Sequence, residues 1–214
     1  MNYETARANM IEQQIRPWNV LEMQTLNALN EVRREDFVPE NYRDLAFADI
    51  QINISDNEVM LEPKVGARMI ESMGLNASSR VLEIGSGTGY LTALLAVICD
   101  QVTSIEIDPK LATKARQNLA MAGFQNTHII ESDCFDYIDS SSEQFDAVLV
   151  TGSVPEIQPL FAKLVSGDGC IVGAQGSDPA MQVVILNADG KLKTLFETSV
   201  PRLRNIAEET SFTF

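Results

Sequence analysis

The chain has 214 residues, of which 45% belong to the hydrophobic set, and this predicts one domain with a substantial core. Its 30 acidic and 16 basic residues give a formal net charge of −14, which disfavours a nucleic-acid partner because the excess repels a phosphate backbone. Three widely spaced cysteines and a single histidine argue against structural zinc and against a disulfide scaffold, so no metal is expected.

Residues 1–62 are expected to form an N-terminal helical layer followed by a lid loop. Apolar residues recur there at helical spacing in two stripes, which Pro17 separates. The polar opening MNYETARANMIEQQI and the absence of a long apolar run predict a cytoplasmic protein that does not associate with membranes. Residues 41–63 show no clear period, which predicts an ordered loop or short strands, the kind of segment that often covers an active site.

From residue 63 onward the predicted helices and strands alternate, which is typical of a parallel α/β sheet. In chain order the pattern predicts helix 64–74, strand 80–84, helix 89–98, strand 102–107, helix 109–122, strand 127–131, strand 145–151, helix 156–165, a turn at 166–169 and strand 170–174. Residues 181–186 and 192–197 flank a turn and are expected to pair as an antiparallel hairpin. The predicted fold class is therefore α/β: a Rossmann-like, doubly wound, mostly parallel seven-stranded sheet over 63–214, with an N-terminal helical layer and a C-terminal antiparallel hairpin.

The most specific motif is VLEIGSGTGYLTALLA at residues 81–96. It predicts a buried strand, a turn with glycines at positions 85, 87 and 89, and a helix whose first amide groups point back into the turn. The spacing Gly-x-Gly-x-Gly differs from the Gly-x-Gly-x-x-Gly of dinucleotide enzymes, whose backbone embraces a pyrophosphate. The motif therefore suits a nucleoside without phosphates better than a nicotinamide cofactor.

Polar residues follow the next strands, at the sheet edge where ligands of such folds bind. Glu106 lies about twenty residues after the turn begins, where a carboxylate can accept both hydroxyls of a ribose; an ordinary helix-capping charge is the alternative. Asp108 precedes Pro109 and is expected to cap a helix. Asp133 is placed to accept from an adenine amino group, or only to stabilise a turn. The hydroxyl of Thr151 lines the pocket in one interpretation, or belongs to a helix cap in the other.

Glu83 closes a hydrophobic strand, where an unpaired buried charge is costly. It needs backbone amides or a cationic ligand group as partners. A ligand with a nucleoside, an amino-acid arm and a positive centre satisfies Glu83, Glu106 and Asp133 together. S-adenosylmethionine is such a ligand, and it is the expected cofactor.

The sequence resembles class I S-adenosylmethionine-dependent methyltransferases, and specifically the protein-L-isoaspartate O-methyltransferase family. Residues 35–39, 49–63, 81–90, 106, 145–157 and 164–169 carry the resemblance. It implies methyl transfer to a carboxylate of damaged aspartyl residues, hence a protein or peptide substrate and a role in protein repair. The cofactor set that it implies is Glu83, Gly85, Gly87, Gly89, Glu106, Asp133 and Cys134. Neighbouring positions of the same turns and strand ends extend this candidate set: Ser86, Thr88, Ile107 and Thr151.

One loop departs from the family pattern. Members of that family carry roughly D-x-P-x-x-I-G-x-G-Q-T-I-S-x-P, whose Thr and Ser hydroxyls lie beside the methyl-transfer centre. The equal-length segment here is DIQINISDNEVMLEP, at residues 49–63. Glu58 stands at the Gln position, Val59 at the Thr position and Leu61 at the Ser position. No hydroxyl remains where the family keeps its catalytic one, so isoaspartyl activity and the catalytic residues are not assigned from sequence.

The departure leaves several interpretations open. In one, the pocket prefers a neutral or cationic acceptor, including an unidentified small molecule, and Glu58 or Glu62 acts as a base. In another, both glutamates point to solvent and the loop only lids the cofactor. Glu58, Leu61 and Glu62 are thus the candidate acceptor-loop residues. A cofactor-binding module without turnover is a further alternative. In one interpretation Arg202 and Arg204 of the C-terminal segment approach an anionic acceptor; in the other, which is the expected one, the segment is an exposed tail.

Overall fold

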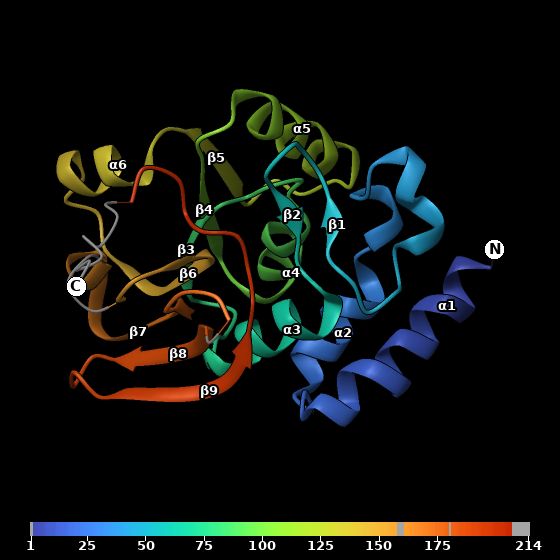
Figure 1. Ribbon diagram of the computed structural model, residues 1–214, viewed down its shortest axis with the longest axis horizontal. Coiled ribbons are helices and arrows are strands. Elements are labelled where there is room, and N and C mark those ends of the chain that lie inside the picture. The colour runs from blue at the N-terminus through green and yellow to red at the C-terminus, as the bar shows by residue number, and fades with distance from the viewer. Residues whose placement is uncertain (1, 158–160, 180, 207–214) are drawn as a thin grey trace, which may run out of the picture.

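A seven-stranded sheet runs through the centre of the computed structural model, which describes residues 2–157, 161–179 and 181–206 (Figure 1). Its order is β5-β4-β3-β6-β7-β8-β9. The strands from β5 to β7 are parallel, whereas β8 is antiparallel to both β7 and β9, as the sequence predicts. The strands are β3 (Arg80–Ile84), β4 (Gln101–Glu106), β5 (Thr127–Glu131), β6 (Phe145–Val154), β7 (Val165–Gln175), β8 (Met181–Asn187) and β9 (Leu192–Thr198).

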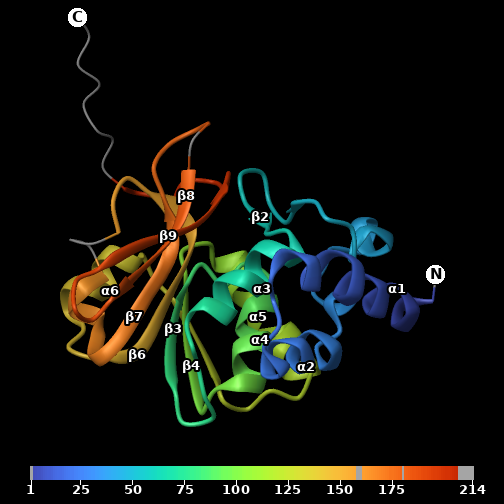
Figure 2. The same ribbon diagram turned by 90° about the horizontal axis from the view of Figure 1, so that it is seen from below.

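Helices cover both faces of this sheet. Figure 2 shows α3, α4 and α5 with the N-terminal layer on one side and α6 on the other. Successive residues of β3 alternate between these sides, because strand side chains point to opposite faces: Val81 belongs to one buried cluster, and Leu82 to the other. The helices are α3 (Pro63–Ser72), α4 (Tyr90–Ile98), α5 (Pro109–Met121) and α6 (Cys134–Ser140). In the described part of the chain, no helix has the length and apolar character that a membrane crossing requires.

The N-terminal layer is helical, and its interruption at Pro17 is confirmed. Helix α1 (Tyr3–Met10) continues as a π-helical segment, Ile11–Ile15, and then a 3-10 turn, Arg16–Trp18, which ends at Asn19 with φ +62°. Helix α2 spans Met23–Glu31, and two 3-10 segments follow at Arg34–Asp36 and Glu40–Leu45. Buried residues of this layer, such as Ile15, belong to the same cluster as one face of the sheet. The layer is thus packed onto the sheet through a continuous apolar core.

The expected lid segment contains a short hairpin in which β1 (Ile52–Asn53) pairs antiparallel with β2 (Val59–Met60). A buried arginine holds its base. Arg34, 1% exposed, donates from Nε to the Ala46 carbonyl and from Nη2 to the Leu61 carbonyl, each over 2.8 Å. One planar guanidinium therefore ties both flanks of the hairpin to the N-terminal layer.

One helix was not predicted, and two predicted elements differ in the structure. Helix α6 follows Asp133 in a stretch to which the sequence assigned no element, because a seven-residue helix is too short to give a clear period in the sequence. Of the expected helix 156–165, residues 158–160 lie outside the described residues, and Ala162–Leu164 is a 3-10 turn that leads into β7. The expected turn at 166–169 is a bulge within β7, where the pairing jumps from Phe145–Val165 to Ala147–Cys170.

Candidate active site

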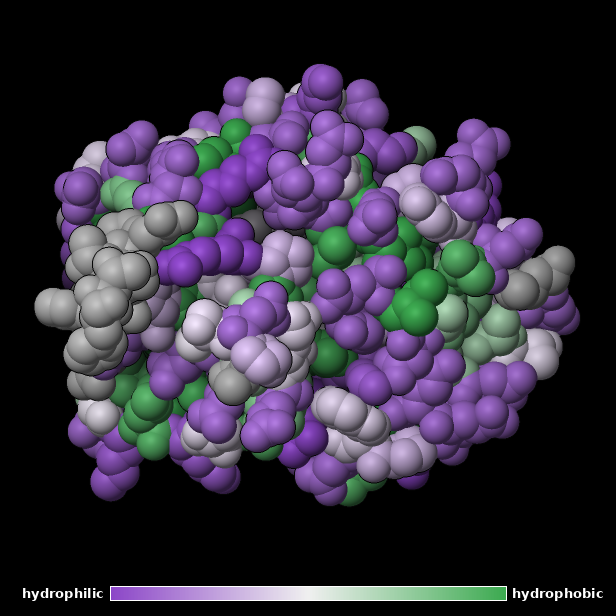
Figure 3. All heavy atoms as spheres, viewed as in Figure 1, coloured by the Kyte–Doolittle hydropathy of each residue, from purple (hydrophilic) through white to green (hydrophobic). Residues whose placement is uncertain are grey.

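A cavity opens at the carboxyl ends of the parallel strands. It lies where β3 is flanked by β4 on one side and β6 on the other, which is the point where strand order reverses and ligands bind in this architecture. Its walls come from the glycine turn, the ends of β4, β5 and β6, the β1–β2 hairpin and the C-terminal segment. Hydrophilic side chains dominate this face of the molecule (Figure 3).

The glycine turn forms the floor of the cavity and is tightly packed. Gly85 has φ +95°, and a Cβ there would lie 2.3 Å from Thr151 Oγ1. Gly87 has φ +54°, and its Cβ would lie 2.9 Å from Ile54 Cδ1. Gly85 requires glycine for its backbone conformation and for space, whereas Gly87 requires it for its positive φ, because the end of the Ile54 side chain can move aside. Thr151 lines the cavity, but its hydroxyl lies 2.9 Å from the Ile84 carbonyl and so holds the turn rather than capping a helix.

Gly89, the last glycine of the turn, does not line the cavity, whereas Gly85 and Gly87 do. It has φ +88° and begins α4, and a Cβ there would lie 3.3 Å from Ala115 Cα on α5. Its expected contact with a cofactor stays a prediction, and the close packing of the two helices accounts for a glycine at this position.

Glu83 is completely buried beneath the turn, and its carboxylate faces the cavity. Its Oε2 accepts hydrogen bonds from the Thr92 hydroxyl and, over 2.7 Å, from the Ser104 hydroxyl. Its Oε1 has no hydrogen-bond partner among the described residues. Burial raises the pKa of Glu83 to about 7. This arrangement leaves one carboxylate oxygen free for a donor or cation that enters the cavity.

Glu106, at the end of β4, stabilises the glycine turn by a hydrogen bond to its backbone. Its Oε2 accepts from the Gly87 amide over 2.8 Å, and its Oε1 accepts from the Asp108 amide over 3.0 Å. Burial raises its pKa. Asp108 is the residue that caps α5, since its side chain accepts from the Lys110 and Leu111 amides. The helix-cap alternative for Glu106 is therefore wrong, and its carboxylate lines the cavity.

Asp133 both caps a helix and borders the cavity. Its Oδ1 accepts from the Phe135 amide over 2.8 Å at the start of α6, and its Oδ2 accepts from Asn205 Nδ2 over 2.7 Å. Cys134 lines the cavity beside it, and burial raises the pKa of its thiol to about 12. Ser86, Thr88 and Ile107 line the cavity as well.

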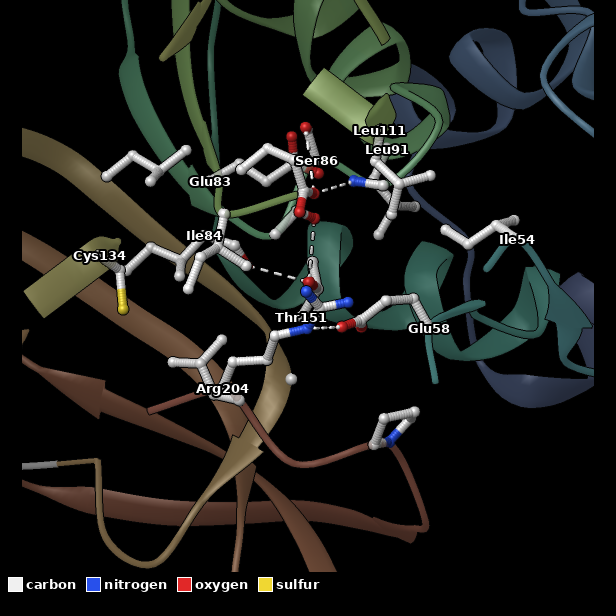
Figure 4. A pocket seen from close by; sticks show the side chains of 18 of the residues that line it. Ile54, Glu58, Glu83, Ile84, Ser86, Leu91, Leu111, Cys134, Thr151 and Arg204 are labelled. Atoms are coloured by element: carbon white, nitrogen blue, oxygen red, sulfur yellow. Dashed lines mark hydrogen bonds and ion pairs between the residues drawn. The ribbon is translucent and has the colours of Figure 1, made fainter. Parts of the chain in front are cut away.

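The hairpin loop supplies the opposite wall (Figure 4). Val59 and Leu61 line it with apolar side chains. Glu58 lines it too, and its Oε1 lies 2.6 Å from Arg204 Nε, so the interpretation in which both glutamates point to solvent is wrong. Glu62 does not line the cavity, and its Oε2 accepts from Gln51 Nε2 over 3.4 Å. Its role as an acceptor-loop residue stays a prediction.

The C-terminal segment is a wall of the cavity rather than an exposed tail, up to residue 206. The Ser153 amide donates to the Pro201 carbonyl, and the Leu203 amide donates to the Ser153 carbonyl, each over 2.9 Å. These bonds dock the segment on the end of β6. The residues that it adds to the cavity wall are Pro201, Arg202, Leu203 and Arg204. Sequence reasoning considered Arg202 and Arg204 near an acceptor but preferred an exposed tail, and it missed Pro201 and Leu203, because nothing local in the sequence indicates this docking; residues 207–214 lie outside the described part.

Apolar residues around the turn were missed as well. Ile54, Tyr90, Leu91 and Leu111 line the cavity. Tyr90 directly follows the glycine motif, which is a signal that sequence reasoning had available. Within the described ranges there is no group of three or more His, Cys, Asp or Glu side chains that is suited to a metal ion.

Comparison with known proteins shows which family this chain is similar to. The family described as protein-L-isoaspartate(D-aspartate) O-methyltransferase matches residues 5–201. A protein-L-isoaspartate O-methyltransferase 2 of Anaeromyxobacter sp. (strain Fw109-5) is 35% identical over 184 residues, 86% of this chain and 75% of that protein. A protein-L-isoaspartate O-methyltransferase 1 of Syntrophobacter fumaroxidans is 34% identical over 190 residues, 88% of this chain and 87% of that one.

Among solved structures, a similar fold occurs in a Plasmodium falciparum protein described as a protein-L-isoaspartate O-methyltransferase. That protein was crystallised in complex with S-adenosyl-L-homocysteine. The TM-score is 0.82 at 18% sequence identity, and the match covers 95% of this chain and 99% of the other. At this identity the likeness concerns the fold, including the sheet whose edge bears the cavity.

Proposed function

Since the chain belongs to the protein-L-isoaspartate(D-aspartate) O-methyltransferase family, we propose that it methylates a carboxylate of damaged aspartyl residues in proteins or peptides, with S-adenosylmethionine as methyl donor. Such a reaction serves protein repair. The observation that carries the cofactor assignment is the unpartnered Oε1 of Glu83, buried at the floor of a cavity beside a glycine turn. A buried acceptor without a partner is costly unless a ligand supplies the donor.

Each part of S-adenosylmethionine has a suitable partner among the residues that line the cavity. Glu83 would accept from the cationic amino-acid arm, and Glu106 would accept from the ribose hydroxyls at the end of β4. Asp133 would accept from the adenine amino group at the end of β5. The glycine turn lets the backbone approach the ligand closely, and Ser86, Thr88, Ile107, Cys134 and Thr151 complete the wall. When bound, S-adenosylmethionine supplies a methyl group already activated by its positively charged sulfur.

The hairpin side of the cavity would receive the acceptor. A carboxylate acceptor is ionised at neutral pH and needs no base, so this chain has to orient the acceptor and exclude water. The apolar side chains of Val59 and Leu61 exclude water there. We also propose that the chain works as one domain, since the N-terminal layer shares its core with the sheet, and that it acts in the cytoplasm with its three cysteines free and buried.

A second candidate function follows from the same loop. Val59 and Leu61 present no hydroxyl, and Glu58 adds a carboxylate where the related loops carry a neutral amide. These features favour a neutral or cationic acceptor, for which Glu58 would serve as base. A cofactor-binding protein without methyl transfer is the remaining alternative.

The test uses the full-length protein with methyl-labelled S-adenosylmethionine. One arm offers an L-isoaspartyl peptide, a second offers the same peptide with normal aspartate, and a third offers a mixture of small-molecule amines and hydroxyl compounds. We expect label in the isoaspartyl peptide as a base-labile ester. Label only in the third arm would replace the proposal by the second function. Calorimetric binding of S-adenosylhomocysteine without transfer to any acceptor would favour the binding module.

A further inference from the structure

The cavity presents an electrostatic problem for the proposed reaction. Four carboxylate side chains line it: Glu58, Glu83, Glu106 and Asp133. An anionic acceptor that enters this space is repelled unless the chain supplies a cation or strong hydrogen-bond donors. The hairpin supplies neither at Val59 or Leu61. Among the described residues that line the cavity, the cationic side chains are Arg202 and Arg204, both from the C-terminal segment.

Arg204 is directed across the cavity mouth toward the hairpin (Figure 4). Its Nε lies 2.6 Å from Glu58 Oε1, and its Nη2 lies 3.7 Å from Asp108 Oδ2. The first contact is a hydrogen-bonded ion pair, whereas the second is beyond hydrogen-bonding distance. A guanidinium carries five N–H donors, so the Nη groups retain donors for a further acceptor. The side chain is 38% exposed, so a ligand can reach it.

The backbone on both sides of Arg204 is fixed. The Leu203 amide donates to the Ser153 carbonyl, and a Cβ on Gly152 would lie only 3.2 Å from the Leu203 backbone nitrogen, so the segment packs closely on the end of β6. On the other side, Asn205 has φ +59° and donates from Nδ2 to Asp133 Oδ2. Arg204 is therefore held between two anchored neighbours, with Glu58 fixing the orientation of its side chain.

We propose that Arg204 is the specificity-determining residue that binds the carboxylate of the methyl acceptor, and that Glu58 positions it. This inference rests on the proposed function and deepens it: the class of substrate is an anionic acceptor. A planar guanidinium binds carboxylates through paired hydrogen bonds, which orients the acceptor without a hydroxyl at position 59 or 61. In the absence of acceptor, Glu58 neutralises the guanidinium. When an acceptor binds, its carboxylate takes the free Nη donors.

The first test measures binding rather than turnover. Two peptides are prepared that differ at one group: an L-isoaspartyl residue with its free α-carboxylate, and the same residue with an α-carboxamide. Each is titrated calorimetrically into the protein saturated with S-adenosylhomocysteine. We expect the wild-type protein to bind the carboxylate peptide at least about tenfold more tightly, because a charge-assisted contact is made with only one of the two peptides.

The variants then assign this preference to a residue. Arg204→Gln is expected to abolish the preference for the carboxylate peptide. Arg204→Lys is expected to restore it in part, since Lys keeps the positive charge but lacks the paired donors of the guanidinium. Glu58→Gln is expected to strengthen carboxylate binding, because its amide oxygen can still accept from Arg204 Nε and orient the side chain, whereas the competing negative charge is removed. Lys163→Gln removes one positive charge at the amino end of β7, the opposite edge of the sheet, and serves as the matched control. A thermal melt of each variant checks that it is folded.

Four outcomes overturn the proposal. They are a wild-type protein without preference for the carboxylate peptide, a preference that survives Arg204→Gln, a preference that Arg202→Gln removes in its place, and a weaker carboxylate affinity in Glu58→Gln. The carboxylate of the cofactor would be a rival anion for Arg204. An affinity for S-adenosylhomocysteine that falls about tenfold in Arg204→Gln, without a change in peptide preference, assigns the residue to the cofactor and overturns the proposal.

Methyl transfer to the carboxylate peptide is measured in parallel, which separates the two proposals. A preference that depends on Arg204, without transfer of the label, supports the binding role of Arg204 and refutes the proposed function. Transfer of the label without any such preference supports the proposed function and refutes the role of Arg204.

Discussion

The Ser104 hydroxyl donates to Glu83 Oε2 over 2.7 Å, from the position directly beside Glu83 on the neighbouring parallel strand. With Thr92, it satisfies one carboxylate oxygen and leaves the other for a ligand. Stabilisation of the charge is incomplete, because burial raises the pKa of Glu83 to about 7. The buried Glu83 carboxylate therefore destabilises the fold when the cavity is empty, and it stabilises the complex once a cationic ligand binds. The first two predictions test these two effects.

Cofactor affinity should rise with pH through about 7. Below that value Glu83 is protonated in the empty site, and a cationic ligand group must then displace its proton. We expect the dissociation constant of S-adenosylhomocysteine to fall about tenfold between about pH 6 and about pH 8. Calorimetry across this range checks it, with Glu83→Gln as the variant that should bind weakly and lose the pH dependence. A pH dependence that persists in Glu83→Gln would assign it to another group.

The stability of the empty protein should respond in the opposite sense. The folded pKa of Glu83 lies above its ordinary value of 4.5, so its contribution to stability is lost as pH rises from about 4.5 through about 7. Glu83→Gln should raise the free energy of unfolding by ~2 kcal/mol at about pH 8 and by less at about pH 5. Urea unfolding of the cofactor-free protein measures this, and Glu31→Gln, on the exposed surface, is the control. Equal effects at both pH values would refute the account.

For a substitution at Gly85, the matched control is Gly123, which lies outside the glycine turn. Both have positive φ, +95° and +86°, but a Cβ at Gly85 would meet Thr151 Oγ1 whereas a Cβ at Gly123 would meet nothing within 4 Å. Gly123→Ala should cost ~1 kcal/mol in unfolding free energy from backbone strain alone, and Gly85→Ala about 2 kcal/mol more together with a loss of cofactor affinity. Adding Thr151→Ala should relieve part of the extra cost. Equal costs at the two glycines would contradict the clash.

Arg34 and its neighbour Arg33 test how the hairpin is positioned. Arg34 is buried and spans two carbonyls, whereas the side chain of Arg33 is 63% exposed. Arg34→Lys keeps the charge, but an ammonium group cannot donate to both carbonyls as the planar guanidinium does. The variant should therefore lower the unfolding free energy by ~2 kcal/mol and raise KM for the acceptor several-fold. Cofactor affinity should change less than the acceptor KM, although the Arg34 guanidinium lies over the ring of Tyr90 at the start of α4, 4.5 Å from its centroid. Arg33→Lys should leave all three quantities unchanged; a similar loss there would point to a general charge effect.

The three cysteines should be unreactive in the native protein. Burial raises the pKa of Cys99 and Cys134 to about 12 and that of Cys170 to about 11, so almost no thiolate is present near neutral pH. We expect an aromatic disulfide reagent to react at least ~100-fold more slowly with the native protein than with the protein in urea. Rapid native labelling of Cys134 that S-adenosylhomocysteine suppresses would reveal local opening of the cavity instead.

The glycine turn and the strand ends were predictable because the information is local. Alternating glycines with positive φ, an apolar run before them and a helix after them lie within sixteen consecutive residues, 81–96. Asp108 before Pro109 predicted a helix cap for a similar reason, and the structure confirms it. Gly89 shows the limit of such reasoning, because a glycine needed for helix packing looks the same in sequence as one that faces a ligand.

The sequence by itself determined the sheet, the hairpin at its end and the turn at the carboxyl end of β3, since hydrophobic periodicity and backbone conformation are properties of short segments. Only the tertiary structure decided what faces the hairpin loop. Glu58 and Arg204 are 146 positions apart, and the ion pair exists because backbone bonds to Ser153 carry the C-terminal segment across the cavity. Long-range docking of this kind depends on packing among several elements, which no local pattern records. The cofactor side of the site was thus largely set by local sequence, whereas the acceptor side was set by the fold.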